Sequence, residues 1–281
     1  MSQTKDDGDV LIQNPEESPI TGKSSLSFKW KIIIIISVLV IVIIIGVILF
    51  AVLKGDSDDD IKVLDPIVIE PVSEYTHCII WLHGLDNCPE NFQDLFKVEV
   101  PFAKKNNTKI ILMRAPYQVM SFNQQKQTSW FDIFSFPINN SQCYNFTDAT
   151  RSKKMVEKII NQEAKKLNGK YQNIYVGGHS QGACISLYTA YNFDKLLGGV
   201  LACSGVLFEQ VQINGDKKKL NVFLAHGEND QAIPFEFHKK TVERIKDYEG
   251  VKTYYYPKHG HDITGYEKVD MGGFLNDTMI D

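Results

Sequence analysis

The first strong pattern along the chain is an uncharged apolar run from Ile32 to Leu53, rich in isoleucine and valine. A helix that crosses a bilayer needs roughly 20 consecutive apolar residues, whereas a cleaved signal peptide has an apolar core of about 7–15 residues. The run therefore predicts a retained transmembrane helix. The polar residues 1–31 before it predict a disordered tail, and residues 54–65 after it predict a linker.

In the remaining chain, residues 66–281, short apolar runs of strand length alternate with segments of helical period. Strands are expected over 78–82, 110–113, 174–176, 199–203, 222–225 and 251–256, and helices over 90–105, 149–167, 181–190 and 236–248, with a short element at the C-terminus. Such alternation predicts one α/β domain, a mostly parallel sheet with helices on both faces. The stretch 117–147 shows no clean period, and loops of that length are often functional.

Composition narrows the classes of partner. The chain has 281 residues, 43% of them hydrophobic, and a formal net charge of −4. A slightly negative net charge does not indicate the basic surface that nucleic-acid binding requires, so no nucleic-acid partner is expected. The five cysteines are an odd number, which argues against a disulfide scaffold, although Cys88 and Cys143 both fall in loops and could pair.

The sequence Gly178-His179-Ser180-Gln181-Gly182 lies between an expected buried strand and an expected apolar helix. Gly-x-Ser-x-Gly in that setting is the nucleophile-elbow pattern. The strand-to-helix turn is so tight that a Cβ at either glycine would strike the neighbouring backbone. The turn would expose the Ser180 hydroxyl at the start of a helix, whose dipole favours a developing oxyanion.

A serine nucleophile needs a base, and the base needs a group that orients it. Asp230 follows the expected strand 222–225, and His259 and His261 both follow the strand 251–256. The order Ser, Asp, His is the one expected when a nucleophile elbow carries a triad. By position alone, either histidine could be the base. This chemistry requires no metal or cofactor, and none is predicted.

Across about residues 66–275 the chain resembles the acyl-protein thioesterase, or phospholipase/carboxylesterase, family of α/β-hydrolases. The resemblance is carried by short segments in the same order: Trp81-Leu82-His83-Gly84-Leu85, Arg114-Ala115-Pro116, Ser129-Trp130-Phe131-Asp132, Gly178-His179-Ser180-Gln181-Gly182, His226-Gly227 with Asp230 and Ile233-Pro234, and Gly260-His261.

The resemblance implies an α/β-hydrolase fold and selects His261 as the base, because the family's histidine follows a glycine. It implies that the backbone N–H groups of Leu85 and Gln181 form the oxyanion hole and that Trp130 helps to shape the acyl pocket. The chain departs from the family at Asp86-Asn87, where Gly-Asp is usual, and this puts turnover and substrate range in question.

Together these features predict a membrane-anchored serine hydrolase that cleaves carboxylic esters or thioesters, lipid or acylated protein, through an acyl-enzyme. Its type could be acyl-protein thioesterase, lysophospholipase or carboxylesterase. The alternative from another class is a catalytically silent hydrolase fold used for binding or adhesion, and a serine peptidase is a third possibility. The sequence does not indicate an oligomeric state.

The flanks of the apolar run suggest its orientation. Lys23, Lys29 and Lys31 precede it and Lys54 follows it, so the positive-inside rule predicts a cytoplasmic N-terminus and a lumenal or extracellular catalytic domain. Acceptor sequons for N-glycans agree with that orientation and occur at Asn106, Asn139, Asn145 and Asn276. A lumenal domain would favour lysophospholipids or small esters over cytoplasmic palmitoyl-proteins.

Overall fold

The structure is a computed structural model that describes residues 28–53, 62–213 and 217–280, apart from several side chains of the first helix. Most of the predicted tail and linker therefore lies outside the described residues. The chain divides into two compact units, Met1–Gly55 and Asp56–Asp281. The first contains the helix α1 (Phe28–Leu53). Within the described part of the chain, no helix qualifies as long and apolar enough to cross a membrane.

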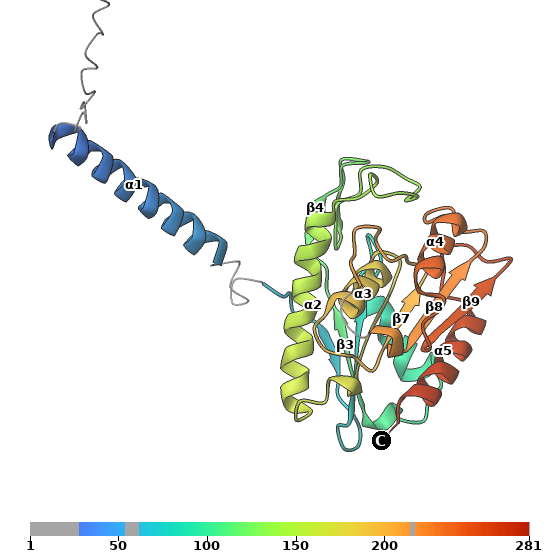
Figure 1. Ribbon diagram of the computed structural model, residues 1–281. Coiled ribbons are helices and arrows are strands. Elements are labelled where there is room, and N and C mark those ends of the chain that lie inside the picture. Colours follow the sequence, from blue (N-terminus) through green and yellow to red (C-terminus); the bar gives the residue numbers. More distant parts are fainter. Residues whose placement is uncertain (1–27, 54–61, 214–216, 281) are drawn as a thin grey trace, which may run out of the picture. The chain divides into compact units, whose positions relative to one another are not determined.

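The second unit is built on one central sheet (Figure 1). Among the described residues its strands lie in the order β1-β3-β2-β6-β7-β8-β9, and all neighbours are parallel except β1, which pairs antiparallel to β3. The strands are β1 (Ile67–Ile69), β2 (His77–Leu82), β3 (Thr108–Met113), β6 (Ile174–His179), β7 (Gly199–Cys203), β8 (Val222–Gly227) and β9 (Val251–Tyr256). The six predicted strands are thus confirmed, and β1 is an additional short edge strand.

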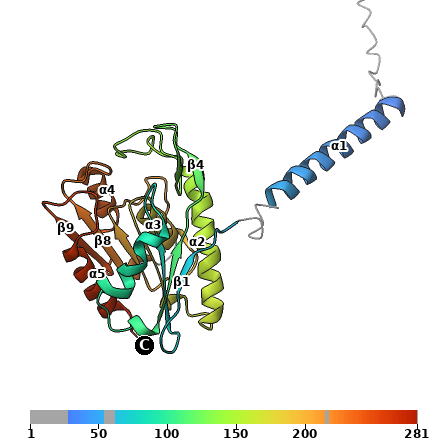
Figure 2. The ribbon, with the colours of Figure 1, turned by 180° about the vertical axis from the view of Figure 1, so that it is seen from behind.

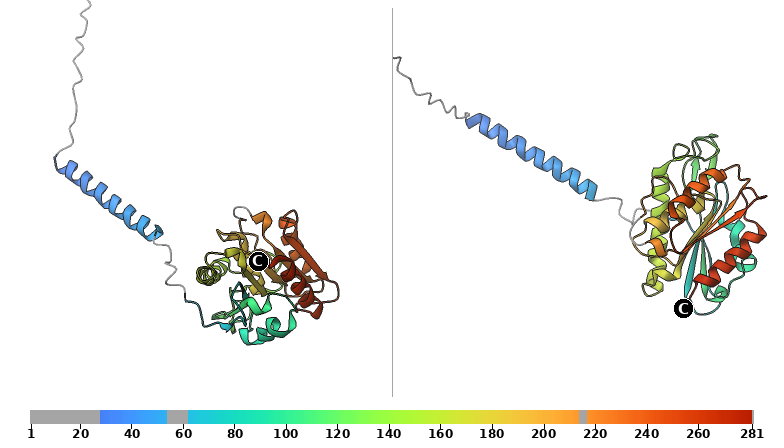
Figure 3. Two further views of the ribbon diagram at one scale, coloured as in Figure 1. Left: turned by 90° about the horizontal axis from the view of Figure 1, so that it is seen from below. Right: turned by 45° about the vertical axis from the view of Figure 1, so that its right-hand side comes forward.

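Helices cover both faces of this sheet, as expected (Figures 2 and 3). One face is covered by α2 (Phe146–Lys166), α3 (Gln181–Asn192) and α4 (Phe235–Ile245), and the other by α5 (Gly265–Thr278) with the segment 89–107. Every residue of β2 is buried, with Ile80 and Leu82 in the first core and Ile79 and Trp81 in the second. A strand buried on both faces favours apolar residues along its length, which explains the continuous apolar run Cys78–Leu82 after the buried His77.

The single helix predicted over 90–105 is wrong. The segment forms three short helical turns instead: η2 (Pro89–Phe92), η3 (Leu95–Glu99) and η4 (Lys105–Asn107). The break lies at Val100, whose backbone is extended, with φ −93° and ψ 114°. It precedes Pro101, and the proline ring sterically disfavours the helical region for the residue before it. The apolar side chains of the segment still pack on the sheet.

The long stretch 117–147 begins with the hairpin β4 (Tyr117–Val119) and β5 (Lys126–Thr128) and then runs irregularly to Asn145. There the Asn145 side chain accepts hydrogen bonds from the N–H groups of Thr147 and Asp148 and caps α2. Cys143 lies buried in this loop with its Sγ 3.6 Å from the carbonyl of Pro137. All five cysteines are free, so the considered Cys88–Cys143 disulfide is wrong.

Candidate active site

Ser180 occupies the sharp turn between β6 and α3. Its backbone has φ 57° and ψ −121°, a left-handed conformation that few non-glycine residues adopt, and its N–H donates to the carbonyl of Cys203 at 2.9 Å. A Cβ at Gly178 would lie 2.5 Å from the Leu82 carbonyl oxygen, and one at Gly182 would lie 2.1 Å from it. Both glycines are therefore required by the close passage of β2, as the sequence predicted.

Two hydrogen bonds link Ser180 to His261 and His261 to Asp230. Ser180 Oγ lies 2.7 Å from His261 Nε2, and His261 Nδ1 lies 2.6 Å from Asp230 Oδ2. Since the carboxylate can only accept, Nδ1 carries the proton and Nε2 is free to accept the Ser180 hydroxyl. Asp230 follows β8, His261 follows the neighbouring strand β9, and Ser180 follows β6, so three parallel strands of one sheet bring the side chains together.

Asp230 is held as an oriented carboxylate. Its Oδ1 accepts the backbone N–H groups of Ala232 and Ile233, each at 2.9 Å. Burial acts to raise the pKa of Asp230, but the hydrogen bond and charge of His261 and the Ile233 N–H outweigh it and leave the pKa below its ordinary value. The group therefore stays ionised at neutral pH, which stabilises a positive charge on His261.

The two histidines that follow β9 lie in different places. The ring of His259 lies against Tyr256, with centroids 6.2 Å apart, and the His259 carbonyl accepts the N–H of Asn229. His261 instead faces the serine, and its own carbonyl accepts Nε2–H of His179 at 2.8 Å. Burial, with a smaller effect of His261, lowers the pKa of His179 to about 4, so this ring stays neutral. The sequence analysis assigned no role to His179.

The turn from His83 to Asn87 lies directly against the nucleophile. A Cβ at Gly84 would sit 3.2 Å from the Cβ of Ser180. Among the described residues, the N–H of Leu85 donates to no backbone carbonyl, and Gln181 is the first residue of α3, where helical N–H groups lack intrahelical acceptors. The two predicted oxyanion donors thus belong to segments that flank Ser180.

The departure from the family at Asp86 is accommodated by the backbone. Asp86 has φ 54°, the left-handed region that glycine prefers and that aspartate tolerates better than most residues. Its N–H donates to the Thr128 carbonyl at 2.9 Å, and Thr128 Oγ1 donates to the Asn87 carbonyl at 2.7 Å. The turn is therefore closed against β5 without the glycine.

Trp130 lies beneath this turn in the core. Its indole N–H donates to the His83 carbonyl at 2.7 Å, and its backbone N–H donates to Gln181 Oε1 at 2.9 Å. The ring is 1% exposed, so Trp130 packs in the core and holds the turn, and its predicted contact with an acyl chain stays a prediction. Gln181 also donates from Nε2 to the Phe131 carbonyl at 2.9 Å, a side-chain role that the sequence did not reveal.

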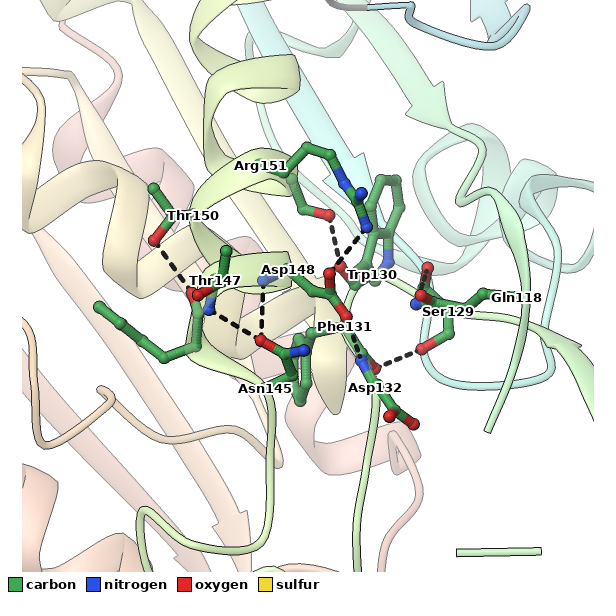
Figure 4. Close-up of polar contacts among 12 residues, drawn as sticks. Gln118, Ser129, Trp130, Phe131, Asp132, Asn145, Thr147, Asp148, Thr150 and Arg151 are labelled. Atoms are coloured by element: carbon green, nitrogen blue, oxygen red, sulfur yellow. Dashed lines mark hydrogen bonds and ion pairs between the residues drawn. The ribbon is translucent and has the colours of Figure 1, made fainter. Parts of the chain in front are cut away.

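The segment 129–132 is also fixed to the start of α2, as Figure 4 shows. The Ser152 hydroxyl donates to the Trp130 carbonyl, and the Asp132 N–H donates to Asp148 Oδ2 at 3.3 Å. From the hairpin, Gln118 Nε2 donates to the Ser129 carbonyl at 3.1 Å. These contacts fix the backbone of residues 129–132 beside the nucleophile, although the segment has no regular secondary structure.

A second imidazole faces Asp230. His226 Nε2 lies 2.8 Å from the Ile233 carbonyl, which fixes its proton there, and 3.3 Å from Asp230 Oδ2. Its ring packs on His238 with centroids 4.2 Å apart. Burial lowers the pKa of both, that of His238 to about 3, so both are neutral. In the described residues, no three His, Cys, Asp or Glu side chains are grouped so as to hold a metal ion.

A family model and several known proteins match most of the chain. A family model described as Phospholipase/Carboxylesterase matches residues 64–279. The chain is 29% identical over 233 residues to acyl-protein thioesterase 1 of Mycosarcoma maydis, covering 76% of this chain and 97% of that protein. It is 30% identical over 212 residues to the probable carboxylesterase SOBER1-like of Arabidopsis thaliana, covering 72% and 78%.

Among solved structures, Arabidopsis thaliana SOBER1 superposes with a TM-score of 0.66 at 23% identity, covering 73% of this chain and 100% of that chain. Zea mays acyl-protein thioesterase 2 gives a TM-score of 0.64 at 20% identity, covering 76% and 99%. At these identities the likeness concerns the fold, and it confirms the α/β-hydrolase architecture of the domain.

Proposed function

This chain belongs to the phospholipase/carboxylesterase family of serine ester and thioester hydrolases, and we propose that Ser180, His261 and Asp230 are its catalytic triad. One observation carries the proposal. A strained, positive-φ serine shares a 2.7 Å contact with an imidazole whose other nitrogen lies 2.6 Å from a buried carboxylate. Nucleophile, base and orienting group thus have the separations that acyl transfer requires.

In the proposed reaction, Ser180 Oγ attacks the acyl carbonyl carbon while His261 Nε2 takes the hydroxyl proton. The imidazolium, stabilised by Asp230, then gives that proton to the leaving alkoxide or thiolate as the carbon–oxygen or carbon–sulfur bond breaks. Water attacks the acyl-enzyme with His261 again as the base, and the carboxylic acid leaves.

The tetrahedral intermediates carry a negative oxygen, which the N–H groups of Leu85 and Gln181 would stabilise. Each such donor is typically worth about 3 kcal/mol in the transition state. The close approach of the Gly84 backbone to Ser180, where a Cβ would lie 3.2 Å from the serine Cβ, and the hydrogen bond from Trp130 to the His83 carbonyl support this role. Both hold the turn at the serine before substrate arrives, so little reorganisation is needed.

The substrate class follows from the acyl chemistry. The two relatives are named acyl-protein thioesterase and carboxylesterase, and a triad of this kind serves oxygen and sulfur leaving groups alike. The rival function is a catalytically silent binding or adhesion protein. The hydrogen bonds that link Ser180, His261 and Asp230 argue against it, because a silent fold has no need to keep them.

We further propose that α1 anchors the enzyme in a membrane. Its apolar run Ile32–Leu53 contains no charged residue. An uncharged apolar run of this length matches the roughly 20 residues that a membrane-spanning helix needs. The lysines before the run favour a cytoplasmic N-terminus and a lumenal or extracellular catalytic domain. Lysophospholipids or small esters would then be the accessible substrates.

The test uses the full chain in detergent with a fluorophosphonate probe, which labels activated serines. We expect wild type to be labelled, Ser180→Ala to lose all labelling, and Ser186→Ala to keep it. Ser186 is the matched control, a buried α3 serine whose hydroxyl donates to the Gly182 carbonyl. Labelling that persists in Ser180→Ala would contradict the assignment of Ser180 as the nucleophile. A folded wild-type protein that does not react would favour the binding-protein function. Matched oxygen and sulfur esters then give the substrate preference.

A further inference from the structure

His179, the residue before the nucleophile, lies between two segments that the proposed mechanism uses. It is the last residue of β6. Its Nδ1 lies beside the turn from His83 to Asn87, where a Cβ at Gly84 would be 3.3 Å from it. Its Nε2 lies 2.8 Å from the backbone carbonyl of His261, and the two imidazole rings have their centroids 5.0 Å apart. One ring thus adjoins both the turn that would supply an oxyanion donor and the loop that carries the base.

The contact with the carbonyl fixes the tautomer of His179. A carbonyl oxygen can only accept, so Nε2 carries the proton and donates it to the carbonyl of His261. Burial, with a smaller effect of the His261 charge, lowers the pKa of His179 to about 4. The ring is therefore neutral at pH 7. A neutral donor suits this place, because a second positive charge would oppose the imidazolium that forms on His261 during the reaction.

The backbone around His261 has no other support of this kind. Within the part of the chain that the structure describes, the bond from His179 is the one hydrogen bond made by the backbone of residues 260–263. Asn229 donates to two carbonyl groups earlier in the same loop. At Gly260 a Cβ would meet only the Asn229 carbonyl oxygen, at 3.9 Å, so close packing does not restrain this glycine, and its backbone is intrinsically free. The bond from His179 therefore restrains the loop where the base is attached.

We propose that His179 is a positioning residue that holds the backbone of His261 in place relative to Ser180 and to the turn at Gly84, a role that rests on the proposed catalytic function. Proton transfer requires His261 Nε2 within hydrogen-bond reach of Ser180 Oγ, and the two atoms lie 2.7 Å apart. A misplacement of about 1 Å in such a pair can cost about 100-fold in rate. Because the restraint acts on a reacting group, its loss should lower kcat and leave KM nearly unchanged.

The test removes the donor and keeps an aromatic ring, as His179→Phe in the full chain in detergent. We expect kcat for a chromogenic ester and the rate of fluorophosphonate labelling to fall about tenfold or more, with complete labelling in the end. His179→Gln, whose amide N–H can lie near the position of Nε2, should recover most of the loss. The matched control is His259→Phe, which removes an imidazole that lies against Tyr256 in the same loop and should react as wild type does.

The outcomes distinguish this role from the triad itself. Folded wild type that is never labelled would overturn both, whereas labelling of His179→Phe at the wild-type rate would overturn only the role of His179. Equal losses in the phenylalanine and glutamine variants would assign the effect to ring packing and overturn the role of the hydrogen bond. Nitrogen NMR of isotope-labelled histidines in wild type needs no folded variant. We expect a neutral His179 with its proton on Nε2 at pH 7, and a proton on Nδ1 alone would overturn the proposal.

Discussion

At the residue scale, Asp230 is surrounded by four potential donors. Its Oδ1 accepts the N–H groups of Ala232 and Ile233, and its Oδ2 lies 2.6 Å from His261 Nδ1 and 3.3 Å from His226 Nε2. A buried carboxylate is costly unless it is paired and hydrogen-bonded. The contact with His226 gives Asp230 a fixed direction, and we infer that His226 is a positioning residue that acts through Asp230.

Replacing His226 with leucine should lower kcat for a chromogenic ester about tenfold, equivalent to about 1.4 kcal/mol in activation free energy, with little change in KM. His226→Gln, which can keep a donor near the Nε2 position, should recover most of the loss. The measurement is steady-state kinetics alongside the melting temperature. A lowered melting temperature with unchanged kcat would mean that His226 serves only to fill the core.

At the element scale, α5 packs closely against the segment 89–107 on the same face of the sheet. Adjacent glycines in this helix have opposite surroundings: a Cβ at Gly272 would lie 2.2 Å from the Pro101 carbonyl oxygen, whereas one at Gly273 would meet nothing within 4 Å. The backbone of α5 thus approaches the turn that Pro101 imposes on the segment 89–107. The helix break at Val100–Pro101 and the glycine at position 272 therefore belong to the same backbone contact.

Gly272→Ala should therefore destabilise the fold by about 3 kcal/mol, because backbone on both sides of the contact must move. Gly273→Ala should be neutral or stabilise by about 0.5–1 kcal/mol, because glycine in a helix interior has excess conformational freedom to lose. Chemical denaturation of both variants measures the difference. Similar effects of the two substitutions would contradict this packing.

The start of α5 contains a buried carboxyl, Glu267, which accepts the Thr264 N–H in a capping box. Burial raises its pKa to about 7. Between about pH 4.5 and 7 the folded state holds a proton that the unfolded state has lost, so the free energy of unfolding falls as pH rises, by up to about 1.4 kcal/mol per pH unit. Above the folded-state pKa of Glu267, both states have lost the proton and this contribution to the pH dependence ends.

Glu267→Gln should remove that slope and be more stable than wild type at pH 8, since the amide is uncharged and can still cap the helix. Unfolding measured at pH 5, 6, 7 and 8 tests this. Exposed Glu249→Gln is the control and should keep the wild-type dependence. Parallel curves for wild type and Glu267→Gln would show that the buried carboxyl does not titrate in this range.

At the scale of the whole molecule, the proposed membrane anchor would leave residues 66–281 on one side of a bilayer, and the glycan sequons test which side. The four sequon asparagines differ in exposure and in hydrogen bonding. Asn106 and Asn139 are exposed in turns, Asn145 caps α2 with its side chain, and Asn276 accepts the Ala103 N–H from within α5. Glycans are expected on exposed loops, so Asn106 and Asn139 are the acceptors that a lumenal domain would use.

Expressed in a eukaryotic secretory system, the full chain should migrate more slowly by about two glycans, and peptide N-glycosidase should remove the shift. Asn106→Gln with Asn139→Gln should abolish it, while Asn145→Gln should leave it unchanged. An unshifted protein whose domain is digested by protease outside sealed microsomes would instead establish a cytoplasmic domain, and would make acylated cytoplasmic proteins the accessible substrates.

The sequence by itself determined the features whose signals are local. The continuous apolar strands, the helical period of α2 and the two elbow glycines all reflect constraints that act within a few residues or across one turn. For this reason the strands appeared close to their predicted positions. The order Ser180, Asp230, His261 along the chain was likewise readable, because parallel strands deliver their carboxyl ends to one edge of the sheet.

Tertiary structure decided what depends on contacts distant in the chain. Only the path after β9 shows that His261, and not His259, reaches the serine. Only the packing of 129–132 on α2 buries Trp130 beneath the turn from His83 to Asn87. The left-handed Asp86 and the contact of His226 with Asp230 also arise where separate segments meet. A short sequence window contains each of these residues but not the residues that surround it in space. Those surrounding residues determine the tautomer of a histidine, the burial of a side chain and the direction in which it points.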